Sequence, residues 1–99
     1  RALHALGEGD TCVQARPLAD AGALEVFVHS PDRDGLFAAI VITLDRLGLA
    51  IAQARVLDGP RGRVFDSFEV VPADPRMVTD ADAVADRLRT VLAGPLGEL

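Results

Sequence analysis

The stretch of sequence that decides the fold is residues 30–37, which reads Ser30-Pro31-Asp32-Arg33-Asp34-Gly35-Leu36-Phe37. It separates two segments with different hydrophobic periods. Before it, residues 24–30 alternate, with Leu24, Val26 and Val28 on one side and Glu25, Phe27 and His29 on the other, which is typical of a half-buried strand. After it, apolar residues recur at helical spacing, namely Leu36, Phe37, Ile40, Val41, Leu44 and Leu47. The sequence therefore predicts a strand, a compact turn and a helix, with Asp32 or Asp34 as the helix cap and Gly48 at its end.

Three further elements follow, and one precedes. Residues 49–57 and 63–71 are predicted strands, joined by a hairpin turn that contains Gly59 and Gly62. A second helix is predicted over residues 81–92, capped by Thr79 with Asp82 three residues later and stopped by Gly94-Pro95. Residues 11–16 alternate weakly, which is compatible with one more strand before Pro17.

This order of elements predicts an α+β, ferredoxin-like fold, in which one antiparallel sheet carries both helices on one face. Such a fold normally ends in a strand, but residues 96–99 are too few to form it. We therefore expect the last strand to be absent, or replaced by residues 11–16 at the edge beside residues 24–30. The expected domain is 11–95, with 1–10 a linker or disordered tail and 96–99 a tail. Because the chain begins at Arg1 and not at Met, we interpret it as a piece of a longer protein.

Composition excludes several classes of partner. The formal net charge of the 99-residue chain is −5, whereas a nucleic-acid or anionic-membrane binder needs a basic face. No apolar run approaches the ~20 residues that a membrane span requires. Cys12 is the single cysteine, so no internal disulfide can form and a reducing compartment is expected.

Residues 30–37 resemble the signature of the ACT family of regulatory domains, in which Asp-Arg-x-Gly-Leu-Leu links the first strand to the first helix. Residues 49–56, the turn at 59–62 and residues 66–70 resemble the following elements of that family in the same order. Residues 26–33, with Leu-Phe-Ala-Ala at 36–39 and Leu-Asp-Arg at 44–46, are most similar to the ACT domains of bifunctional uridylyltransferase/uridylyl-removing enzymes.

The resemblance implies a module that senses an amino acid, glutamine in this subfamily, for an enzyme that modifies the PII nitrogen-signalling protein in the bacterial cytoplasm. It implies no catalytic residue in this segment, since the nucleotidyltransferase and hydrolase domains of such enzymes have no counterpart here. ACT domains pair side by side, so the expected partners are a second copy or a tandem ACT domain, together with the parent's catalytic domains. An interaction-only ACT module that binds no ligand is the alternative.

The residues themselves suggest how a ligand would bind. A helix N-terminus offers unpaired N–H groups to a carboxylate, and Gly35 allows close approach. Asp32 or Asp34 could accept from an α-ammonium group, and Gln53 on the facing strand of a partner could hold an amide side chain. The candidate ligand site is therefore Ser30, Asp32, Arg33, Asp34, Gly35, Leu36 and Gln53. The competing interpretations are that this turn is only a capped helix start and that Arg33 is only a solvated charge.

Other chemistry finds little support. No metal and no cofactor are expected, because His4, Cys12 and His29 do not share metal-ligand spacing. Cys12 and His29 could meet on paired strands, but nothing orients them as a nucleophile and its base. An acylphosphatase-like enzyme would need an anion cradle, and an RNA-binding sheet would need a basic, aromatic surface. We expect His29 and Phe27 to contact a protein on the open face of the sheet, and Asp66 to accept a structural hydrogen bond from a backbone N–H.

Overall fold

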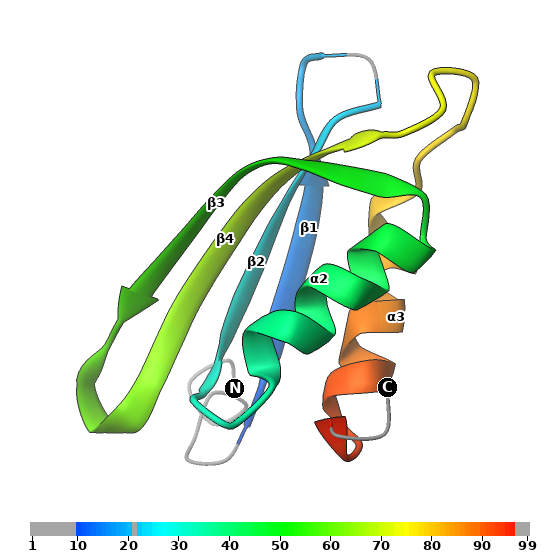
Figure 1. Cartoon of the computed structure of the whole chain (residues 1–99). Coiled ribbons are helices and arrows are strands. Elements are labelled where there is room, and N and C mark those ends of the chain that lie inside the picture. Colours follow the sequence, from blue (N-terminus) through cyan, green and yellow to red (C-terminus); the bar gives the residue numbers. More distant parts are fainter. Residues whose placement is uncertain (1–9, 21, 97–99) are drawn as a thin grey trace.

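The computed structural model describes residues 10–20 and 22–96 of the chain. They form a single sheet covered by two helices (Figure 1). The elements in chain order are β1 (Cys12–Pro17), β2 (Leu24–Pro31), α2 (Leu36–Arg46), β3 (Leu49–Asp58), the short 3-10 helix η1 (Pro60–Gly62), β4 (Arg63–Pro72) and α3 (Ala81–Leu92). Residues 1–9 of the predicted linker and residues 97–99 of the predicted tail lie outside the described residues.

The sheet has the strand order β1-β2-β4-β3, and every neighbouring pair is antiparallel. β1 pairs with β2 from Cys12 opposite His29 to Pro17 opposite Leu24. The predicted use of residues 11–16 as a replacement edge strand beside β2 is therefore confirmed. The ferredoxin-like α+β fold is also confirmed, with the outer strand that usually ends the fold supplied from the N-terminal side.

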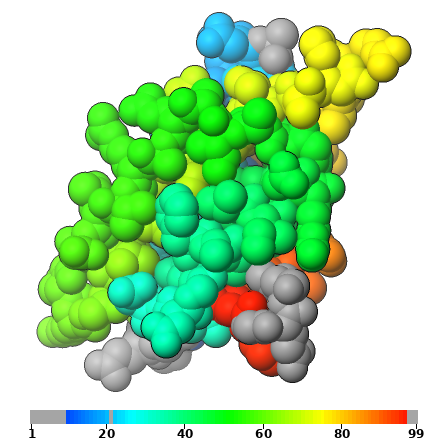
Figure 2. All heavy atoms as spheres, viewed as in Figure 1, coloured from blue at the N-terminus to red at the C-terminus, as the bar shows by residue number. Residues whose placement is uncertain are grey.

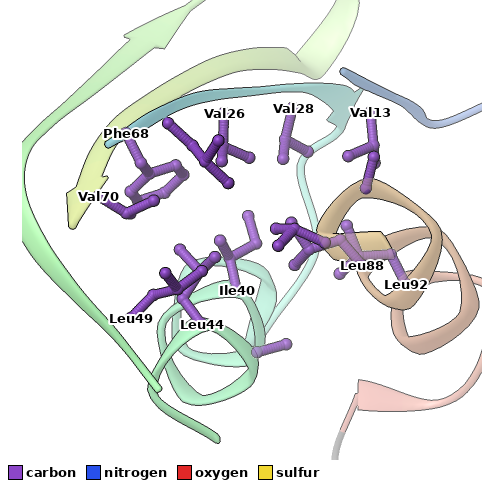
Figure 3. Close-up of a cluster of buried hydrophobic side chains, with 14 of the residues drawn as sticks. Val13, Val26, Val28, Ile40, Leu44, Leu49, Phe68, Val70, Leu88 and Leu92 are labelled. Atoms are coloured by element: carbon purple, nitrogen blue, oxygen red, sulfur yellow. The ribbon is translucent and has the colours of Figure 1, made fainter. Parts of the chain in front are cut away.

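One core holds the sheet and the helices together. Val13, Val26 and Val28 of the sheet point toward α2 and α3, which present Ile40 and Leu88 (Figure 3). The last two are fully buried, and burying a large apolar side chain contributes roughly 1.5–3 kcal/mol. Sixteen buried residues form this cluster, only one of which, Phe68, is aromatic. The core is thus almost entirely aliphatic, and it fixes both helices on one face of the sheet.

The predicted apolar stripe of α2 is confirmed in part: Leu36, Ile40 and Leu44 are buried, and Leu47 packs against the core. Val41 is only half-buried, and Phe37 is 46% exposed. Its ring still lies over the edge of the core, with its centroid 5.8 Å from that of Phe68. The β3–β4 hairpin extends past the helices (Figures 1 and 2), and this leaves Val56 and Leu57 more than half exposed. The sheet is therefore longer than the helix layer that covers it.

Both predicted helix caps are wrong. Neither Asp32 nor Asp34 caps α2; the N-cap is Gly35, in a left-handed conformation with φ +83°, and no side chain bonds to the first turn. The cap of α3 is Asp80, not Thr79, and its carboxylate accepts from the N–H groups of Asp82 and Ala83. The left-handed glycine starts α2 one residue later than an aspartate cap would require. The prediction for the other end of α2 is confirmed, since Gly48 follows the C-cap with φ +79°.

The cap of α3 can be tested by substitution. Asp80→Ala removes the acceptor of two backbone N–H groups and should lower the free energy of unfolding by about 0.5–2 kcal/mol. Thr79→Ala is the matched control and should change it by much less, because the described structure gives the Thr79 side chain no capping hydrogen bond. Urea unfolding followed by circular dichroism measures both. A larger loss for Thr79→Ala would restore the original prediction.

Candidate functional site

The candidate site at the β2–α2 turn begins with two residues whose polar groups are already engaged. Ser30 is completely buried, and its hydroxyl donates to the Pro31 carbonyl oxygen at 2.9 Å and lies 3.2 Å from the hydroxyl of Thr11. Arg33 donates from a guanidinium nitrogen to the carbonyl oxygen of Leu92 at the end of α3. Ser30 and Arg33 therefore hold the turn in place. The hydrogen bond to α3 shows that Arg33 is more than the solvated charge of the competing interpretation.

The other four residues of the turn surround the start of α2. Asp32 and Asp34 are exposed, and the N–H of Asp32 donates to the Gly62 carbonyl oxygen at 2.8 Å, which joins the turn to the β3–β4 hairpin. Gly35 is exposed at the N-cap, whereas Leu36 is buried in the core. The N–H of Leu36 donates to the Arg33 carbonyl oxygen at 3.1 Å. With no side chain at the cap, the next amides of α2, those of Phe37 and Ala38, stay available to an anion, and the partial positive charge of the helix end favours one.

A buried carboxylate completes this region. Asp66 points to the helix side of β4, is only 3% exposed, and its Oδ1 has no hydrogen-bond partner among the described residues. The expected hydrogen bond from a backbone N–H to this oxygen is therefore wrong. Burial raises the pKa of Asp66, and the negative charges of Asp32 and Asp58 raise it further. Three carboxylates thus lie where the turn meets the hairpin, and their combined charge favours a cationic group.

Gln53 lies elsewhere in the same chain. It is opposite Glu69 on the open face of the sheet, where it lines a hollow of about 270 Å³ with Glu25, Arg55, Ser67 and Phe68. One chain therefore brings Ser30, Asp32, Arg33, Asp34, Gly35 and Leu36 together but not Gln53, which was predicted to act from a partner.

A further cleft adjoins the turn. It measures about 510 Å³ and is lined by Asp10, Thr11, Pro31, Arg33, Arg89, Leu92 and Ala93. Of the predicted site residues it includes only Arg33. Its second arginine, Arg89, ties α3 to β1 by donating to the Val13 carbonyl oxygen at 2.7 Å and also pairs with Asp86.

On the open face, His29 occupies the predicted position. Its ring stacks on that of Phe65 with 4.1 Å between centroids, and its Nε2 accepts from Nε of Arg63 at 3.0 Å. Burial lowers the pKa of His29, and the charge of Arg63 lowers it further. Cys12 is opposite His29 in the sheet, but the accepting nitrogen of the imidazole is engaged by Arg63. This arrangement gives the thiol no oriented base.

Two further searches of residues 10–20 and 22–96 bear on function. No group of three or more His, Cys, Asp or Glu side chains is arranged to hold a metal ion. No helix in this part of the chain is long and apolar enough to cross a membrane.

Comparison with known proteins gives one consistent name. The chain is 57% identical over 89 residues to the bifunctional uridylyltransferase/uridylyl-removing enzyme of Xanthomonas campestris pv. campestris (strain B100), and equally so to that of Xanthomonas euvesicatoria. It is 33% identical over 85 residues to the enzyme of the same name from Methylococcus capsulatus. This chain is homologous to a segment of that enzyme.

The match covers most of this chain but little of its relatives. It spans 89% of the chain and 10% of the Xanthomonas campestris enzyme, so the chain has about a tenth of the length of these curated relatives. No family model matches the sequence, and no solved structure matches it either. The similarity is therefore to a short segment of each of these larger relatives.

The unpartnered oxygen of Asp66 predicts a measurable effect on stability. Because the folded-state pKa lies above the ordinary value of 3.8, the folded chain holds the proton more tightly than the unfolded chain. Stability is therefore gained as pH falls through the raised pKa toward the ordinary one, and the charge is destabilising at neutral pH. Asp66→Asn should raise the urea midpoint at pH 7, and its advantage should shrink as pH falls toward 4.

Asp45→Asn is a suitable control, because Asp45 is an exposed residue near the other end of α2. Its urea midpoint should stay close to that of the parent chain across the same pH range. A clear loss of stability in Asp66→Asn at pH 7 would show that the carboxylate makes stabilising contacts.

Proposed function

We propose that this chain is an ACT-type regulatory module of a bifunctional uridylyltransferase/uridylyl-removing enzyme, and that it binds an amino acid, glutamine, at the β2–α2 turn. The fold and the homology to a segment of that enzyme support the first part. The binding of glutamine, the action of the parent on PII and the coupling to its catalytic domains are carried by the resemblance of residues 30–37 and by the chemistry of the turn.

The observation that carries the ligand proposal is the carboxylate of Asp66. Leaving a buried polar atom unpaired costs about 1–3 kcal/mol, and more for a charged group. An amino acid would supply what this region lacks, since its α-ammonium group can donate to Asp66 Oδ1 under the influence of Asp32 and Asp58. Its α-carboxylate would accept from the uncapped amides at the start of α2. Both charges of a zwitterion are thus complemented.

An interaction-only module is the second candidate, and the long outer edge of β3 favours it. β3 has ten residues and pairs only with β4, so its other edge is open along its whole length in the described structure. Five hollows of about 160–510 Å³ on the described surface are lined by residues other than Asp32, Asp34 and Gly35. Because an exposed edge strand is a template for pairing, a second copy or a tandem ACT domain would extend the sheet there and complete a ligand site between modules.

Isothermal titration with glutamine tests the ligand proposal. The 99-residue chain should give saturable heat with glutamine, and much less with amino acids of other side chains. Asp66→Asn should weaken binding about tenfold or more, as expected for a lost charge-assisted hydrogen bond of about 1.5–3 kcal/mol. Gly35→Val should abolish binding, because a β-branched residue is strained at φ +83° and would displace the helix start.

Asp45→Asn serves again as the control and should bind glutamine as the unsubstituted 99-residue chain does. Saturable heat that Asp66→Asn leaves unchanged would refute the assigned contact. If no amino acid gave heat while the circular dichroism spectrum showed a folded chain, the interaction-only function would be favoured.

Sedimentation velocity tests the open edge. We expect the isolated chain to sediment as a dimer at high concentration. Val56→Lys places a charge on β3 at a residue that is 53% exposed, and it should shift the chain toward monomer. Val78→Lys, in a loop at 91% exposure, should leave the dimer unchanged. If the unsubstituted 99-residue chain stayed monomeric at every concentration, this would count against edge pairing.

A further inference from the structure

The hollow on the open face of the sheet has the composition of a binding site. It measures about 270 Å³ and is lined by Glu25, Gln53, Arg55, Ser67, Phe68 and Glu69. Its position follows from the strand register: Glu25 and Gln53 both lie opposite Glu69, and Arg55 lies opposite Ser67. Three strands therefore contribute to one patch, on the opposite side of the sheet from Asp66.

The shape of the hollow has two causes. Ser67 has the smallest of the outward-facing side chains of β4, which otherwise carries Arg63, Phe65, Glu69 and Val71 on this face. The register of β3 shifts between Ile51 and Gln53, and such a bulge bends the strand and re-aims the side chain that follows it. Longer side chains therefore surround a short one at the place where the sheet bends.

The charges of the hollow are unusually arranged. Glu25 and Glu69 are directly opposite each other, and like charges in that position destabilise a sheet. Arg16 neutralises only Glu25, at 2.6 Å. Across residues 10–20 and 22–96, no ion pair joins Glu69 or Arg55 to another side chain. Glu69 and Arg55 thus lie diagonally on neighbouring strands, and neither forms a salt bridge among the described residues.

We propose that this hollow is a binding site for a small zwitterion, of the size and class of a polar amino acid. Glu69, with Glu25 beside it, would accept from the ammonium group, and Arg55 would bind the carboxylate. Such charge-assisted bonds are the stronger class of hydrogen bond, and arginine suits a carboxylate geometrically. Gln53 and the Ser67 hydroxyl would supply a donor and an acceptor to an amide or hydroxyl on the ligand. This site goes beyond the one proposed at the β2–α2 turn and does not depend on it.

The test is a titration of the ¹⁵N-labelled 99-residue chain with glutamine, followed by two-dimensional NMR. Saturable shifts are expected at the backbone amides of Gln53, Arg55, Ser67 and Glu69, with a roughly millimolar dissociation constant, as suits a shallow, solvated site. N-acetylglutamine lacks the ammonium group and should bind at least about tenfold more weakly.

Variants separate the hollow from the rest of the surface. Glu69→Gln keeps the shape but removes the charge and should weaken binding about tenfold. Ser67→Leu should fill the hollow and abolish the shifts, and a well-dispersed spectrum will show whether this variant is folded. Asp45→Asn, on the other layer of the molecule, should leave the dissociation constant unchanged.

The outcomes distinguish this site from the one at the turn. Shifts confined to residues 35–39 and Asp66 would overturn the proposal and support the turn as the binding site. The absence of shifts anywhere would overturn both. Shifts in the hollow that persist unchanged in Glu69→Gln and Ser67→Leu would also overturn it, because they would not arise from the groups named here.

Discussion

The structure depends on the antiparallel pairing of β1 with β2. This pairing gives the sheet its fourth strand and places Val13 in the core, where it lies close to Leu88 and Leu92 of α3 (Figure 3). It also presents the Val13 carbonyl oxygen to Arg89 at 2.7 Å. Without β1, α3 would cover no strand at that edge and its apolar face would be exposed to water. The N-terminal strand is therefore what allows the second helix to pack.

The region of the β2–α2 turn contains two features that lower the stability of the fold. A helix start with a serine or aspartate cap and a hydrogen-bonded Asp66 would be more stable than the one observed. The chain instead has a left-handed glycine at the cap and a buried carboxylate oxygen without a partner. Unfavourable features of this kind tend to concentrate at functional sites. They support the turn as the place where a ligand would contribute most to stability.

The sequence predicts local structure well where periodicity is strong, and poorly where single atoms decide. The alternation of residues 24–30 and the stripe of α2 predicted a strand and a helix that the structure confirms. The caps of α2 and α3 were wrong because adjacent residues could each serve, and only backbone geometry chooses between Thr79 and Asp80. The inward position of Asp66 follows from alternation, but its proximity to Asp32 and Asp58 depends on how the turn meets the hairpin.

The hydrogen bond from Arg33 to Leu92 has a mechanical consequence. It connects the turn that starts α2 directly to the last residue of α3, two points 59 positions apart in the chain. The first described residues of the chain line the same cleft, so the entry of the polypeptide, its exit and the turn adjoin one another. Any displacement of the turn must strain or break this link, and a pull on the end of α3 must act back on the turn. The Arg33 guanidinium thus couples any movement of the β2–α2 turn mechanically to the end of α3, and the reverse.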